Sequence, residues 1–287
     1  MFYTMNEKTL KLEEIKVNIL VLNFGSFFVK FQLFNITEEK KEPLVRGMVE
    51  NIGIGQWELT YYAKDKEKII ETFEDVRVPT IVGDIIVKFL TDKKYSVITS
   101  KTQIDVVGDR VVHGSEFFSE LVVFTDEVKQ KIKECISFVP LHNLHNLCDV
   151  EQTEEVLPNV PQVAVSDTFH STMPSYAFIF ALSFNNYYKK YETQRYGFYS
   201  TSYRYASNRT VELMIQPIEK LKIITCHLTN SASVCAVRYG KSVVTSMKFT
   251  SLEGFVMGAR CDSIDPVIVL QNMACEKSFL YMMLLQY

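Results

Sequence analysis

Short apolar runs rich in β-branched residues alternate along this chain with segments of helical apolar spacing, and this alternation limits the possible folds. VNILVLN at 17–23 predicts a buried strand, and FVKFQLFN at 28–35 predicts its hairpin partner, with Gly25-Ser26 as the turn. Residues 45–62 predict further strands. Because strands and helices alternate in two halves of the chain, we expect an α/β architecture with a cleft between two lobes.

Short apolar runs and helical apolar spacing also predict the strands and helices beyond residue 62. They are helices at 80–93, 125–138, 143–157 and 202–215, strands at 104–114, 160–168 and 221–228, and a hairpin around Gly240-Lys241. Thr125 directly before a helical pattern is typical of an N-cap residue. The predicted domains are an extension at 1–16, an α/β lobe at 17–168 and a partial second α/β lobe at 169–287.

The composition of the chain limits the kinds of partner and the cellular location that we expect. The 287 residues are 47% hydrophobic and carry a net charge of -3 with both signs interspersed, so no basic stripe predicts a nucleic-acid partner. The longest apolar runs, such as 17–22 and 278–285, are too short to cross a bilayer. The N-terminus lacks an apolar secretory core, which predicts a cytoplasmic location. The six cysteines form no CxxC pair and predict free thiols.

Three strand ends in the first half carry side chains suited to anions. In NFGS, Gly25 lets backbone N–H groups approach an anion, and Asn23 and Ser26 add neutral donors, although most such turns are only turns. Arg110 in GDRVVHGS offers a planar fork for carboxylate or phosphoryl oxygens, and a surface ion pair is the alternative. Asp167 ends the strand at 160–168, where it is either a functional carboxylate or a cap.

Three further motifs follow in the second half: RYGFYSTSYRY at 195–205, HLTNSAS at 227–233 and MGARCDSIDP at 257–266. Taken in order with NFGS, GDRVVHGS and VAVSDTFH, these motifs resemble those of the acetate kinase family. The resemblance extends from residue 17 to about 272. It implies a two-lobed fold like that of the sugar kinases, actin and heat-shock chaperones. The family continues well beyond this length, so the resemblance also implies that the second lobe is incomplete here.

The resemblance implies a reaction as well. It is the direct in-line transfer of a phosphoryl group from ATP to acetate, with Mg²⁺, giving ADP and acetyl phosphate. Propionate and butyrate are alternative short carboxylates, and a homodimer is a possible assembly. The implied catalytic residues are Arg110, Asp167, Tyr199 and Arg260; the implied substrate- or nucleotide-binding residues are Asn23, Ser26, Lys30, His227 and Asn230, with Asn23 also near Mg²⁺.

Several positions depart from the family pattern. Aromatic rings replace small hydroxyl or imidazole side chains, and hydroxyl residues replace glycines. They are Phe27, Phe28, Tyr199 and Tyr203 in the first group and Ser115, Ser200, Thr229 and Ser231 in the second. A phenol is neutral at pH 7 and longer than imidazole, so Tyr199 predicts impaired transfer. The alternatives are an inactive degenerate homologue or a non-enzymatic nucleotide-binding or assembly module.

Overall fold

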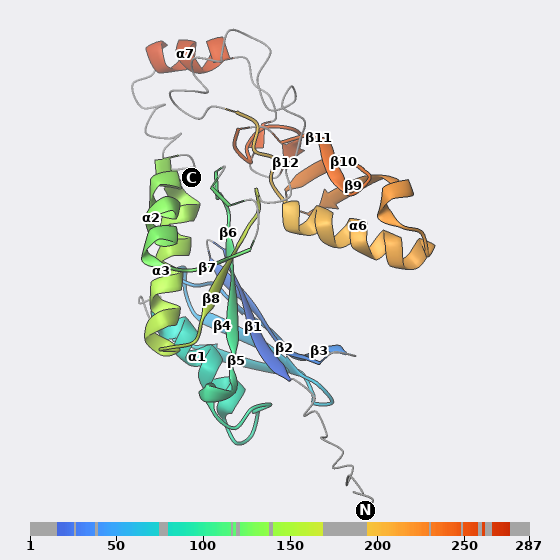
Figure 1. Ribbon diagram of the computed structural model, residues 1–287. Coiled ribbons are helices and arrows are strands. Elements are labelled where there is room, and N and C mark those ends of the chain that lie inside the picture. The colour runs from blue at the N-terminus through green and yellow to red at the C-terminus, as the bar shows by residue number, and fades with distance from the viewer. Residues whose placement is uncertain are drawn as a thin grey trace, which may run out of the picture. The chain divides into compact units, whose positions relative to one another are not determined.

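The computed structural model describes most of the chain (Figure 1). The described residues are 16–25, 27–37, 40–74, 80–115, 117–118, 121–137, 140–168, 194–229, 231–247, 249–257, 260–261 and 266–275. Two predicted site residues, Ser26 and Asn230, lie outside these ranges, and so does nearly all of the predicted extension at 1–16.

The largest sheet has eight strands in the order β5-β4-β3-β2-β1-β6-β8-β7. Its strands are β1 (Val17–Phe24), β2 (Phe28–Ile36), β3 (Lys41–Glu50), β4 (Trp57–Ala63), β5 (Ile69–Phe73), β6 (Val106–Val111), β7 (Val122–Val123) and β8 (Gln162–Ser166). Strands β1 to β5 pair antiparallel in sequence, as hairpins do. The predicted β1–β2 hairpin is confirmed, and Gly25 N–H closes its turn on the carbonyl of Phe28 at 2.8 Å. The short strands β5 and β7 were not predicted.

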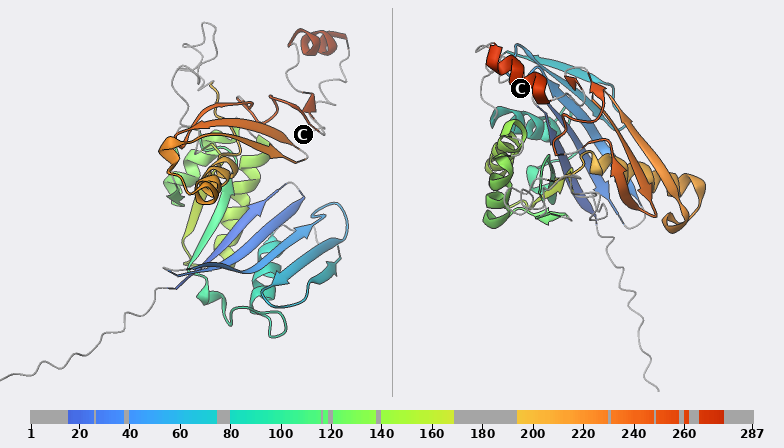
Figure 2. Two further views of the ribbon diagram at one scale, coloured as in Figure 1. Left: turned by 90° about the vertical axis from the view of Figure 1, so that its right-hand side faces the viewer. Right: turned by 90° about the horizontal axis from the view of Figure 1, so that it is seen from above.

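The chain divides into two compact units, and the first comprises residues up to 108 together with 152–161. Its core forms because alternate side chains of β1 to β4 point to the same face of the sheet and pack against α1 (Thr80–Thr91). Figure 2 shows this helix lying along the sheet. Trp57, Phe31 and Tyr61 are at most 1% exposed at the centre of this layer. Ile86 and Leu90, four residues apart on α1, are equally buried.

The second unit comprises residues 109–151 and those from 162 onward. Its helices are α2 (Asp126–Glu134), α3 (Pro140–Val156, which runs into the first unit), α6 (Ser200–Met214) and α7 (Pro266–Cys275). The predicted cap is confirmed, because Thr125 Oγ1 accepts a hydrogen bond from the N–H of Val128 at 3.2 Å. A second sheet in the order β11-β10-β9 packs against α6.

The strands of this second sheet are β9 (Lys222–Leu228), β10 (Ala232–Arg238) and β11 (Lys241–Thr245), and β12 (Val256–Met257) pairs with β13 (Arg260–Cys261). Short 3₁₀ helices occur at η1 (Lys101–Gln103), η2 (Cys135–Ser137) and η3 (Ile218–Lys220). The predicted β10–β11 hairpin is confirmed, and Tyr239 and Gly240 at its turn both have positive φ.

The predicted α/β fold class is confirmed, and the predicted lobe boundaries stay a prediction. Within the described ranges, no helix is long and apolar enough to cross a membrane.

Candidate functional site

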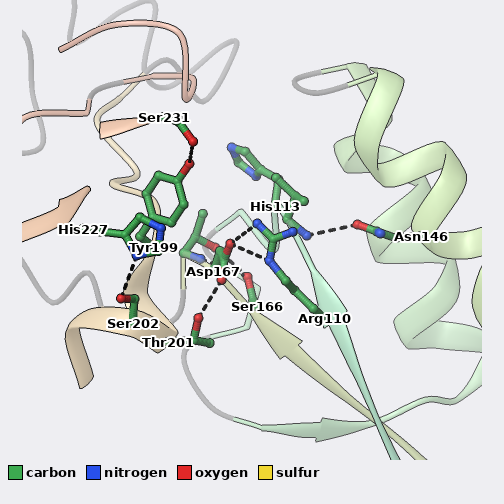
Figure 3. Close-up of polar contacts among 12 residues, drawn as sticks. Arg110, His113, Asn146, Ser166, Asp167, Tyr199, Thr201, Ser202, His227 and Ser231 are labelled. Atoms are coloured by element: carbon green, nitrogen blue, oxygen red, sulfur yellow. Dashed lines mark hydrogen bonds and ion pairs between the residues drawn. The ribbon is translucent and has the colours of Figure 1, made fainter. Parts of the chain in front are cut away.

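An ion pair between Arg110 and Asp167 lies at the centre of the site in the second unit (Figure 3). Arg110 belongs to β6, whose alternation buries Val111 and leaves the arginine side chain 31% exposed. Its Nε and Nη2 both donate to Asp167 Oδ2, at 2.9 and 2.5 Å. Two donors on one oxygen hold the guanidinium plane in a fixed direction.

Asp167 follows β8 directly and is only 2% exposed. Its second oxygen, Oδ1, accepts a hydrogen bond from Thr201 Oγ1 at 2.9 Å. Its backbone is fixed too, because its N–H donates to the carbonyl of Val111 and its carbonyl accepts from the N–H of Ser200. Burial lowers the pKa of Arg110, but the charge and hydrogen bonds of Asp167 outweigh it, so the net pKa is raised. The arginine is therefore a permanent cation with a fixed orientation.

A small pocket of about 120 Å³ opens beside this pair. Arg110 supplies its cation, and Val112 and Phe198 supply apolar wall. The other lining residues are His142, Asp167, Tyr199 and Ser251. A space of this size admits a small ligand. One cation against apolar side chains in so small a space is suited to a short carboxylate.

Two asparagines on α3 hold the backbone that forms this pocket. Asn143 accepts from the N–H of His113 at 3.1 Å and donates to its carbonyl at 2.8 Å. Asn146, one turn further along α3, accepts from the N–H of Val112 at 3.1 Å. Both asparagines are buried. Neither asparagine was predicted from the sequence, although two amides three residues apart on one helix face were the available signal.

The turn after β6 has little room. A Cβ at Gly114 would lie 2.6 Å from Ser166 Oγ, so only glycine fits there. The next residue, Ser115, has a φ of 50° and donates its N–H to Nδ1 of His113 at 3.1 Å. Because positive φ favours glycine, the serine occupies a position where it carries backbone strain. Burial lowers the pKa of His113 to about 4, so its ring is neutral at pH 7.

The start of α6 brings two further predicted residues together. Tyr199 precedes the helix in the left-handed conformation, and its hydroxyl forms a 2.6 Å hydrogen bond with Ser231 Oγ. Its ring stacks on His227 with the ring centres 4.3 Å apart. His227 Nδ1 in turn lies 2.9 Å from Ser202 Oγ. Burial lowers the pKa of His227; the negative charge of Asp167 partly opposes this, and the positive charge of Arg110 adds to it.

The loop that follows β9 is closed by its own hydrogen bonds. Thr229 N–H and Oγ1 both donate to the carbonyl of Ser231, at 2.8 and 3.0 Å. Thr229 does not have positive φ, so the backbone at this position accommodates a threonine without glycine. Of Arg260 only the backbone is described, where it pairs with Met257 between β13 and β12.

The first unit carries Asn23 and Lys30, which are cross-strand partners in the β1–β2 register. Both line an open hollow of about 1040 Å³. Lys30 Nζ lies 5.2 Å from the centre of the Phe28 ring, and that ring also covers Gly25, where a Cβ would come within 2.5 Å of it. Phe27 is 53% exposed. The two predicted residues are therefore brought together in this unit.

Comparison with known proteins identifies the family. The family model described as the Acetokinase family matches residues 18–278, which is most of the chain. The chain belongs to the acetokinase family. The acetate kinase of Caldanaerobacter subterraneus subsp. tengcongensis is 45% identical over 254 residues, covering 88% of this chain and 62% of that protein. The chain thus spans less than two thirds of the length of this curated relative.

Solved structures give the same result for the fold. The Porphyromonas gingivalis acetate kinase is 38% identical, with a TM-score of 0.79 over 91% of this chain and 65% of that one. A propionate kinase from Francisella tularensis is 36% identical, with a TM-score of 0.80 over 89% of this chain and 64% of that one. The fold is therefore that of the acetate kinases, as the resemblance predicted.

A magnesium site does not follow from the described residues. Among them, no group of three His, Cys, Asp or Glu side chains could hold a metal ion. The one carboxylate at the pocket, Asp167, is engaged on both oxygens by Arg110 and Thr201. Mg²⁺ prefers unpaired oxygen ligands in octahedral geometry, so these residues do not fit a protein-held ion.

Proposed function

We propose that this protein transfers a phosphoryl group between ATP and acetate, forming ADP and acetyl phosphate. One observation carries the proposal: Arg110, held by Asp167, faces a pocket of about 120 Å³ with Val112 and Phe198 on its wall. The cation matches a carboxylate, and the apolar wall matches a methyl group. Membership of the acetokinase family supports the same reaction.

The transfer proceeds in line. An acetate oxygen attacks the γ-phosphorus of ATP, the bond from that phosphorus to the bridging oxygen breaks, and ADP leaves with the electron pair. No proton has to move, so the work of the protein is positioning and charge stabilisation. Arg110 supplies a cation that does not titrate, because Asp167 raises its pKa. Asp167 acts on Arg110 and Thr201, and it positions the arginine without receiving a proton.

The remaining predicted residues also have proposed roles. Arg260 is the second cation for the transferred group. The residues proposed to bind the substrate or the nucleotide are Asn23, Ser26, Lys30, His227 and Asn230. Magnesium enters as part of the Mg–ATP substrate. A homodimer stays a prediction. Slow transfer also stays a prediction, and its physical reason is that Tyr199 offers a neutral phenol to the transferred group.

Pocket size bears on which carboxylate is used. Acetate is the smallest of the three acids, and we expect it to fit the pocket of about 120 Å³. Propionate adds one methylene, and a longer chain must displace Val112 or Phe198. We therefore propose that acetate is preferred, that propionate follows and that butyrate is poorest, with each step worth about tenfold in kcat/KM.

The test is acyl phosphate formation from Mg–ATP, trapped as a hydroxamate with hydroxylamine, for the three acids. The wild type is compared with Arg110→Lys, which keeps the charge but loses the two-donor fork, and with Arg209→Lys at an exposed site. We expect turnover on acetate that falls about 100-fold in Arg110→Lys and is unchanged in Arg209→Lys. Folded wild-type protein that binds ADP without turnover would instead indicate the nucleotide-binding module.

A further inference from the structure

The first turn of α6 is a junction between the Arg110 pocket and the β9–β10 hairpin. On one side, Ser200 N–H and Thr201 Oγ1 bind the backbone and carboxylate of Asp167. On the other side, three side chains of the same turn contact the hairpin. They are Tyr199 to Ser231, Ser202 to His227 and Tyr203 to Ser233. Every residue from 199 to 203 is therefore bonded to one side or the other.

Tyr199 is the member of this turn that contacts both sides. It lines the pocket together with Arg110 and Asp167, while its hydroxyl is bonded to Ser231 at 2.6 Å (Figure 3). Its ring covers His227 at 4.3 Å and an interplanar angle of 21°. The phenol has one proton to donate and its oxygen is already in a short hydrogen bond. The geometry therefore directs its polar end to the hairpin.

We propose that Tyr199 is a positioning residue that latches Thr229 and Ser231 through the Ser231 hydroxyl and thereby fixes the nucleotide side of the site relative to Arg110. Thr229 and Ser231 are hydrogen-bonded to each other, so the one bond from Tyr199 to Ser231 holds both residues. Tyr203 is hydrogen-bonded to Ser233, the second residue of β10. In this role Tyr199 acts through Ser231 and not on the transferred phosphoryl group.

The latch is tested without any ligand by hydrogen exchange of the segment 227–233, measured by mass spectrometry. The variants are Tyr199→Phe, Ser231→Ala and the double variant, with Tyr205→Phe as the matched control because it is 72% exposed on the same helix. We expect each single variant to speed exchange of the Thr229 and Ser231 amides about fivefold, the worth of one net hydrogen bond. The double variant should be no faster than either single variant, because both remove the same bond.

Three exchange results would overturn the latch. They are additive effects in the double variant, an unchanged exchange rate in Tyr199→Phe, and amides of Thr229 and Ser231 that are already unprotected in the wild type.

The kinetic readout rests on the proposed function and separates positioning from direct catalysis. If the latch positions the nucleotide side, Tyr199→Phe and Ser231→Ala raise the KM for ADP equally and leave kcat nearly unchanged. If Tyr199 donates to the phosphoryl group, only Tyr199→Phe lowers kcat, which overturns the proposal. Absence of turnover in folded wild type contradicts the proposed function, and the exchange result still decides the latch.

Discussion

Each of the two units is stabilised by a different kind of interaction. In the first, β1 to β4 and α1 bury a continuous apolar layer in which Trp57, Phe31 and Tyr61 are almost fully enclosed. In the second, the turn after β6 and the first turn of α6 are held by side-chain hydrogen bonds from Asn143, Asp167 and their neighbours. Apolar burial is non-directional, whereas a hydrogen bond depends on the direction and distance between two particular atoms. The second unit is accordingly the place where a reactive geometry can be held.

The largest effect should come from opening the apolar layer. Trp57→Ala should lower the free energy of unfolding by about 3–5 kcal/mol, because the side chain is fully buried and its loss leaves a cavity. Urea denaturation measures this. Trp57→Phe is the matched control and should cost less, because it keeps a ring and removes an indole N–H without a partner among the described residues. A loss below about 1 kcal/mol in Trp57→Ala would show that this layer does not dominate the stability of the unit.

A smaller effect is expected where one side chain holds a loop. Asn143→Ala should lower the free energy of unfolding by about 2–3 kcal/mol, because it leaves the buried N–H and carbonyl of His113 without this partner. It should also weaken acetate binding, since the same backbone leads into the pocket. Leu144→Ala, 49% exposed at the next position of α3, is the control. Equal losses in both variants would contradict a specific role for the amide.

The buried imidazole of His113 predicts a pH dependence. Its pKa is about 4 in the folded protein and about 6.5 when unfolded, so between these values the unfolded chain binds more protons. Stability from this group is complete above pH 6.5 and is lost as the pH falls toward 4, by about 2 kcal/mol at pH 5. Unfolding free energies at pH 7 and 5 should show this loss in the wild type and a shallower one in His113→Gln. Identical pH slopes in the two proteins would contradict it.

The smallest effect concerns a local signal that the sequence carries by itself. Thr125→Ala removes the hydroxyl that accepts from the N–H of Val128 and should cost about 1 kcal/mol. Thr125→Ser, which keeps the hydroxyl, should be nearly neutral. Thermal unfolding of the three proteins makes the comparison. A serine variant as unstable as the alanine variant would indicate that the methyl group, and not the cap, matters at this position.

Features set by residues close together in the chain could be predicted from the sequence, whereas contacts between distant residues could not. The β1–β2 hairpin, the Thr125 cap and the β10–β11 hairpin follow from residues close together in the chain, and all three were predicted correctly. Arg110 and Asp167 were each predicted as site residues. Their direct ion pair, which joins residues 57 apart in the sequence, was not predicted. Side chains that act across such distances leave no periodic signal, because their partners are set by the fold.

The asparagines of α3 show this limit most clearly. The spacing of Asn143 and Asn146 places them on one face of a helix, but only the fold reveals that both are buried against the backbone at 112–113. The pairing of Tyr199 with Ser231 is similar. The resemblance drew attention to each as a separate departure from the family pattern, whereas the structure joins them in one hydrogen bond.

The proposed reaction depends most on Arg110 as the anchor of a carboxylate. The most direct test is ATP formation from acetyl phosphate and ADP with Mg²⁺, on folded wild-type protein, Arg110→Ala and the exposed Arg209→Ala. We expect ATP from the wild type and Arg209→Ala, and a loss of about 100- to 1000-fold in Arg110→Ala. Wild-type turnover that survives in Arg110→Ala would place the carboxylate elsewhere, and no turnover from any of the three folded proteins would contradict the proposed reaction.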